Sequence, residues 1–89
     1  MRTIYRHKIP VDDQSHVIEA HGGISGTGTI LFKGPYAYYE VWAEHDPDFN
    51  REIALQVYGT GHEIPEDAVY LSTSLRHVSG LVFHLYELT

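Results

Sequence analysis

Residues 36–45 read YAYYEVWAEH and residues 51–59 read REIALQVYG. Aliphatic or aromatic side chains recur at every second position, which predicts strands with one apolar face, because successive side chains of a strand point to opposite sides. The same alternation continues towards both ends, and helical spacing of apolar residues is hard to find. The pattern predicts an all-β fold, a small antiparallel sandwich or barrel-like domain of about 6–7 strands over residues 1–89. The strands are expected near residues 2–9, 14–20, 24–33, 36–45, 51–59, 68–77 and 81–88.

The turns between these segments predict how the strands pair. Gly34-Pro35 is expected to close a hairpin, and the segment 46–50 to close the next one. The pairs expected from these two turns are Phe32 with Ala37, Ile30 with Tyr39, Gly28 with Val41, Ala43 with Ile53, Val41 with Leu55 and Tyr39 with Val57. The sequence thus predicts a three-stranded meander with one apolar side.

The last hairpin is expected to turn through Val78-Ser79-Gly80, with Gly80 in the left-handed backbone conformation. The pairs that follow are His77 with Leu81, Leu75 with Phe83 and Thr73 with Leu85. This register gives the hairpin one mainly apolar face, with Val82, His84, Tyr86 and Leu88 behind it. The apolar residues expected on that face are Val69, Leu71, Leu75, Leu81, Phe83 and Leu85.

The reverse side of these strands is unusually aromatic for a solvated face and too polar for a dry core. Tyrosine and tryptophan combine a large apolar body with a polar tip, and interfaces are rich in both. Three explanations remain open: a face covered by the other sheet or by residues 1–23 in a closed barrel, a subunit or partner interface, or a small-molecule surface. The candidate interface residues are Tyr36, Tyr38, Trp42, Tyr58, His84 and Tyr86.

The segment Gly59-Thr60-Gly61-His62-Glu63-Ile64-Pro65 is the loop most open to a functional interpretation. Its glycines would let backbone N–H groups approach a ligand, and His62 with Glu63 could form an acid–base or metal pair. The segment lacks the lysine and the following helix of a phosphate-binding loop, and its acidic residues would repel phosphate. The simpler interpretation is a wide connection in which glycine supplies positive φ and Pro65 stiffens the exit.

Catalysis and cofactor binding find little support. No G-x-S-x-G or H-E-x-x-H motif occurs, and the seven histidines are spread along the chain. The carboxylate pairs (Asp12-Asp13, Glu66-Asp67, and Asp46 with Asp48) fall in turns, where Asp commonly bonds its own backbone. Cysteine is absent, which excludes disulfides and thiolate metal sites. We therefore predict a protein that is not an enzyme and has no cofactor and no metal.

The charge balance bears on partners and location. Twelve acidic residues oppose six basic ones, and the basic residues are scattered singly along the chain. Nucleic-acid binding is therefore not expected, because it relies on clustered Lys and Arg. Residues 1–9 have no apolar run of the secretory type, and no segment is apolar enough for a membrane helix. The expected location is the cytoplasm.

Several spaced motifs carry a resemblance to a known family. They are Ile9-Pro10-Val11, Trp42-Ala43-x-x-Asp46-Pro47, Gly59-Thr60-Gly61-His62-x-Ile64-Pro65 and the final segment 81–87. Together they make the chain similar, nearly end to end, to a family of small bacteriophage-encoded proteins of unknown function. The resemblance implies expression in the host cytoplasm of an infected bacterium and an accessory role.

The favoured hypothesis is a phage accessory protein that binds an unidentified host or phage protein and forms a homo-oligomer. A host-directed inhibitory or anti-defence role would be one form of it. The first alternative is a minor virion component. The second is a small-ligand or metal-binding protein that uses the Gly59–Pro65 loop, and a third is a hydrolase too divergent to show its motif.

Overall fold

The computed structural model describes residues 1–77 and 79–88. Over these residues the chain forms strands and no helix, which confirms the all-β class. The strands, seven within the described residues, are β1 (Thr3–Pro10), β2 (His16–Ala20), β3 (Gly22–Lys33), β4 (Tyr36–His45), β5 (Arg51–Gly59), β6 (Val69–Thr73) and β7 (Phe83–Leu88). Their bounds agree with the predicted ones to within two residues, except that β6 ends at Thr73 and not at residue 77.

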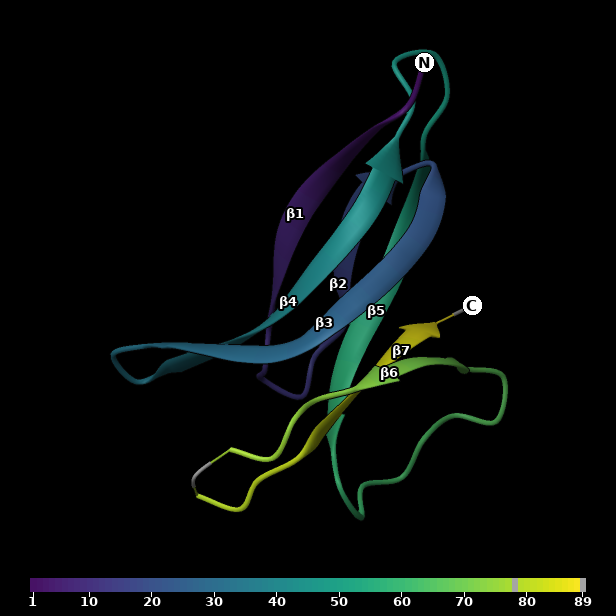
Figure 1. Ribbon diagram of the computed structural model, residues 1–89. Helices are drawn as coiled ribbons and strands as arrows, with labels where there is room; N and C mark the ends of the chain where they lie inside the picture. The colour runs from purple at the N-terminus through teal and green to yellow at the C-terminus, as the bar shows by residue number, and fades with distance from the viewer. Residues whose placement is uncertain (78, 89) are drawn as a thin grey trace.

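The strands divide into two antiparallel sheets. Sheet A has the order β1-β4-β3 and sheet B the order β2-β5-β7-β6. Figure 1 shows β3 running across the front of β5 and β4 across the front of β2, with the N-terminus beside the β4–β5 loop. The fold is therefore a sandwich in which the inner faces of both sheets bury a common core.

The predicted hairpin between β4 and β5 is wrong, because the two strands belong to different sheets. The loop between them crosses from sheet A to sheet B, held by hydrogen bonds from Asp48 N to Asp46 Oδ1 (2.8 Å) and from Asn50 Nδ2 to Asp46 O (2.8 Å). β4 pairs with β1 and β3 instead. The expected partners thus enter one core from two different sheets and do not pair along a ladder.

The core is nonetheless built from the predicted side chains. The buried apolar residues of β4 and β5 meet Ile9, Ala20 and Leu85 from the neighbouring strands. Removing these aliphatic groups from water is the main source of stability, about 1.5–3 kcal/mol for each large side chain. The β4 and β5 residues of this core are Tyr39, Val41, Ala43, Ile53, Leu55 and Val57.

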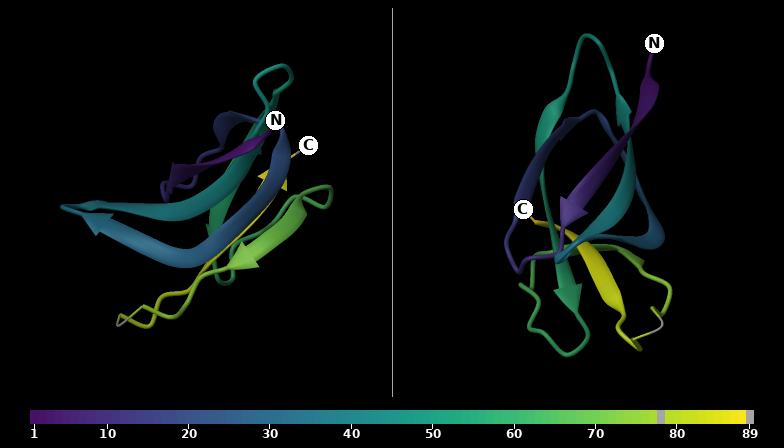
Figure 2. Two further views of the ribbon diagram at one scale, coloured as in Figure 1. Left: turned by 45° about the horizontal axis from the view of Figure 1, so that its top comes forward. Right: turned by 90° about the vertical axis from the view of Figure 1, so that its left-hand side faces the viewer.

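The β3–β4 hairpin follows the predicted register only near its turn. Phe32 pairs with Ala37 and Ile30 with Tyr39, as expected. Beyond them an irregularity between Gly26 and Ile30 makes Gly26, rather than Gly28, the partner of Val41. The hairpin also projects beyond the sandwich (Figure 2), so Phe32 is half exposed instead of buried and its ring packs on His77, with centroids 4.5 Å apart.

The last hairpin is shifted by one residue from the prediction. Gly80 has the expected positive φ of 87°, and His77 N donates to Leu81 O at 3.0 Å, whereas Val78 lies outside the described residues. Further along, Ser74 N donates to Phe83 O and Thr73 faces His84. The shifted residues leave the predicted apolar face, and three of its members are exposed: Val69, Leu75 and Leu81.

The cause of this shift is a contact between the sheets. Leu75 N donates to Gly28 O of β3 at 2.8 Å, so this N–H is hydrogen-bonded to sheet A and not to β7. Ser74 therefore lies opposite Phe83, where Leu75 was expected. The Ser74 hydroxyl also accepts a hydrogen bond from Phe83 N. The sandwich is thereby joined along the edge where β3 meets the end of β6.

Candidate functional site

The outer face of sheet A carries half of the predicted interface residues. Tyr39, Val41 and Ala43 point inward, so the alternate residues of β4 point away from the core. Trp42 is 37% exposed and Tyr36 63% exposed, while Tyr38 is half-buried. The structure therefore brings Tyr36, Tyr38 and Trp42 together along one strand, on the side that faces away from sheet B.

Ion pairs frame Trp42 along β4. On one side Arg6 Nη1 lies 3.3 Å from Glu40 Oε2, and on the other Arg2 Nη1 lies 3.2 Å from Glu44 Oε1. Arg6 belongs to the neighbouring strand β1 and lies directly opposite Trp42, and Arg2 immediately precedes that strand. The tryptophan is thus surrounded by charged groups that already neutralise one another.

The other three predicted interface residues lie on sheet B, which corrects the prediction of one continuous surface. Tyr58 and Tyr86 are neighbours on the outer side of β5 and β7, with ring centroids 5.6 Å apart, edge to face. Tyr58 is only 7% exposed, and burial raises its pKa. Because β4 and β5 are in different sheets, this cluster and the Trp42 strand face opposite ways.

The side chain of His84 is hydrogen-bonded to the hydroxyl groups of two threonines. Its Nε2 lies 2.9 Å from Thr60 Oγ1, and its Nδ1 lies 3.0 Å from Thr73 Oγ1. Thr73 is in turn 2.6 Å from the hydroxyl of Tyr70, whose ring packs on Tyr86. Both ring nitrogens of His84 are therefore engaged within the chain.

The Gly59–Pro65 loop is a turn closed on itself. His62 N donates to Gly59 O at 3.2 Å, and a Cβ on Gly59 would stand 3.3 Å from the His62 ring. His62 Nδ1 lies 3.8 Å from Asp13 Oδ1, with both side chains largely exposed, and Glu63 is exposed. The glycine at position 59 is thus explained by the close ring, and a positive φ of 91° explains Gly61.

The acidic turns at Asp12 and Asp46 act as the sequence predicts. Asp12 Oδ1 accepts from Gln14 N, and Asp46 Oδ1 from Asp48 N. The pKa of Asp12 is lowered chiefly by its hydrogen bond with His16, whose Nε2 is 2.8 Å away. That of Asp46 is lowered chiefly by the Asp48 N–H. Each of these carboxylates therefore stabilises the turn to which it belongs by accepting a backbone N–H.

Sequence reasoning missed one pair of residues, His7 and His45. Strand pairing brings their Nε2 atoms to 3.2 Å, although 38 positions separate them in the chain. Both lie on the inner side of sheet A, where β1 is an edge strand. Burial lowers the pKa of His7, and the adjacent His45 ring lowers it further.

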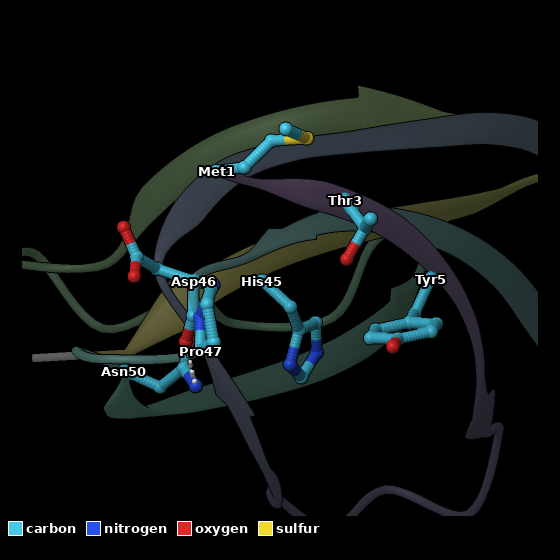
Figure 3. Close-up of a pocket in the computed structure, with 7 residues that line it drawn as sticks. All are labelled: Met1, Thr3, Tyr5, His45, Asp46, Pro47 and Asn50. Carbon is cyan, nitrogen blue, oxygen red and sulfur yellow. Dashed lines mark hydrogen bonds between the residues drawn. The ribbon is translucent and has the colours of Figure 1, made fainter.

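A cavity of about 350 Å³ adjoins the His45 member of this pair. Figure 3 shows the His45 ring between Tyr5 on one side and the Asp46–Asn50 turn on the other. The Tyr5 and His45 rings meet edge to face, with centroids 4.7 Å apart. The residues that line the cavity are Met1, Thr3, Tyr5, His45, Asp46, Pro47 and Asn50.

No three His, Asp or Glu side chains gather closely enough within residues 1–77 and 79–88 to enclose a metal ion between them. Over the same part of the chain, there is no helix with the length and hydropathy needed to cross a bilayer.

Comparison with known proteins identifies one family. The profile of a family described as Domain of unknown function (DUF7352) matches residues 1–89. No curated protein and no solved structure matches the chain.

Proposed function

The chain belongs to the DUF7352 family of domains of unknown function, and on that premise we propose that it is a phage accessory protein that binds another protein in the infected bacterium. The phage context rests on the resemblance of its spaced sequence motifs. The proposed contact surface is the outer face of sheet A, centred on Trp42. The partner is a host or phage protein with an apolar pocket for an aromatic side chain.

The exposure of Trp42 and Tyr36 on one strand is the observation that carries this proposal. Tryptophan, tyrosine and arginine are the residues most enriched among those that dominate binding energy. Here Trp42 stands between two Arg–Glu pairs, an arrangement of an apolar centre and a polar rim that resembles the anatomy of protein interfaces.

The charges of this face favour a protein over a nucleic acid. Arg2 and Arg6 are ion-paired with Glu44 and Glu40, and the chain has a net charge of −6. A phosphate backbone would have to displace these carboxylates before it could use either arginine. An uncharged aromatic contact has no such cost.

The test compares a double variant with a matched control. Trp42→Ser with Tyr38→Ser removes the aromatic centre of sheet A, and Val17→Ser changes an exposed apolar residue on the outer side of sheet B. Each protein is used to capture partners from infected cells, and the captured partner is then purified and titrated. We expect the double variant to bind it at least about tenfold more weakly, and Val17→Ser to bind unchanged.

Two results would contradict the proposal. One is equal binding by the wild type and a double variant whose circular dichroism is that of a folded β protein. The other is abundant copies of the chain in purified phage particles, found by mass spectrometry, because these would indicate a virion component.

We also propose that the protein self-associates, since a domain of 89 residues buries little surface on its own. Sedimentation velocity of the wild type should show a species larger than a monomer. A monomer at all concentrations tested would count against this part of the proposal.

A further inference from the structure

We propose that His7 and His45 together bind a divalent transition-metal ion, Zn²⁺ by preference, through their Nε2 atoms. The site lies on the inner side of sheet A, beside the cavity between Tyr5 and the Asp46–Asn50 turn. It is independent of the outer face of sheet A proposed above.

The separation of the two nitrogens suits a shared ion. Imidazole nitrogens bind zinc at about 2.0–2.1 Å in tetrahedral geometry, which places two of them about 3.3–3.4 Å apart. The Nε2 atoms of His7 and His45 are 3.2 Å apart, and their ring planes differ by only 18°. The centroids lie 5.4 Å apart, so the rings meet nearly end to end, and each ring has to turn by about 35° to aim its lone pair at one tetrahedral ion.

The protonation state suits binding as well. A metal ion needs the neutral form of imidazole, because a protonated ring has no lone pair to donate. At least one ring of a pair this close must be neutral, since one Nε2 donates the hydrogen bond and the other accepts it. The half-burial of His7 favours the neutral form further.

The surroundings hold His45 and leave room for other ligands. Tyr5 packs edge to face on the His45 ring, which restricts its rotation. The cavity of about 350 Å³ beside the ring admits water molecules to the remaining coordination positions. Asp46 lines the same cavity, but its Oδ1 already accepts the Asp48 N–H. The described chain therefore supplies two ligands, fewer than the three or four protein ligands of most zinc sites, and water fills the other positions.

The other five histidines are engaged differently. Each has an oxygen partner and none faces another histidine. Their partners are Asp12 for His16, Phe49 O for His21, Asp13 for His62, Ser79 for His77, and Thr60 with Thr73 for His84. Selectivity for His7 and His45 therefore follows from the pairing of β1 with β4.

The experiment titrates Zn²⁺ into tag-free, chelator-treated protein by calorimetry. The wild type should bind one Zn²⁺ per chain, and His7→Ala and His45→Ala should each weaken binding by at least about tenfold. His62→Ala is the matched control and should bind as the wild type does. In long-range proton–nitrogen spectra of the imidazole rings, zinc should shift Nε2 of His7 and His45 and leave His62 unchanged.

A further variant separates loss of the site from loss of the fold. His45→Gln keeps a polar side chain of similar reach, and its unfolding midpoint in chelator should match that of the wild type while its zinc affinity falls. The proposal is overturned if the wild type gives no heat of binding, if the control loses as much affinity as His45→Ala, or if zinc shifts other histidines instead.

Discussion

The hydroxyl of Tyr39 lies 2.7 Å from Ser72 Oγ and joins the centre of sheet A to the edge strand of sheet B. Tyr39 is the largest fully buried side chain and Ser72 is partly buried, so this hydrogen bond joins the two sheets at the margin of the core. A buried hydroxyl of this kind needs a partner, and the two residues satisfy each other. The contact also places β6 against β3, next to the bond between Leu75 and Gly28.

Replacing Tyr39 with Phe should lower the free energy of unfolding by about 1 kcal/mol, because Ser72 loses its partner inside the core. Urea denaturation followed by circular dichroism measures the change. Tyr36→Phe is the control, since Tyr36 is exposed and should change stability little. Equal effects of the two substitutions would mean that the hydrogen bond across the core contributes nothing.

Stability should fall in alkaline solution in a way that depends on Tyr39. Burial raises the pKa of Tyr39 above its ordinary value of 10.0. The unfolded chain therefore releases this proton first, so the stabilising contribution is complete below pH 10.0 and is lost as pH rises through the folded pKa. Urea denaturation at rising pH should show a smaller alkaline loss for Tyr39→Phe than for the wild type.

A methyl group at Gly26 should disturb the same region. Its Cβ would collide with Ser72 Oγ and approach the Tyr39 ring, both at the meeting of the two sheets. We expect Gly26→Ala to destabilise the fold by about 1–3 kcal/mol. Ser25→Ala, at the exposed neighbouring position, is the control. An unchanged melting temperature for Gly26→Ala would show that β3 and β6 are further apart than described.

Leu85 and Leu75 test the register of the last hairpin. Leu85 is completely buried and Leu75 is 76% exposed, although both were expected on the apolar face. Leu85→Ala should cost about 2–5 kcal/mol and Leu75→Ala less than about 0.5 kcal/mol. Thermal or urea unfolding of the two variants decides the matter. A large loss of unfolding free energy for Leu75→Ala would instead support the register in which Leu75 faces Phe83.

The zinc site and the Trp42 surface differ in how far sequence could predict them. Tyr36, Tyr38 and Trp42 alternate along one strand, so their common face could be inferred locally, and the structure places them together. His7 and His45 carry no spacing motif, because the partners of β1 are set by the whole sheet. Tyr58 was assigned to the face of Trp42 only through the wrong pairing of β4 with β5.

The amino-acid sequence by itself determined the strands, the side of each strand that is apolar, and most members of the core. These properties depend on alternation within a few residues, since the pleat sends neighbouring side chains to opposite sides. The same pattern could not determine which strands pair, because an apolar side is buried equally well beside a neighbour or across a sandwich. Only the tertiary structure decided that the chain crosses between sheets at Asp46, that Leu75 bonds to Gly28, and that His7 meets His45.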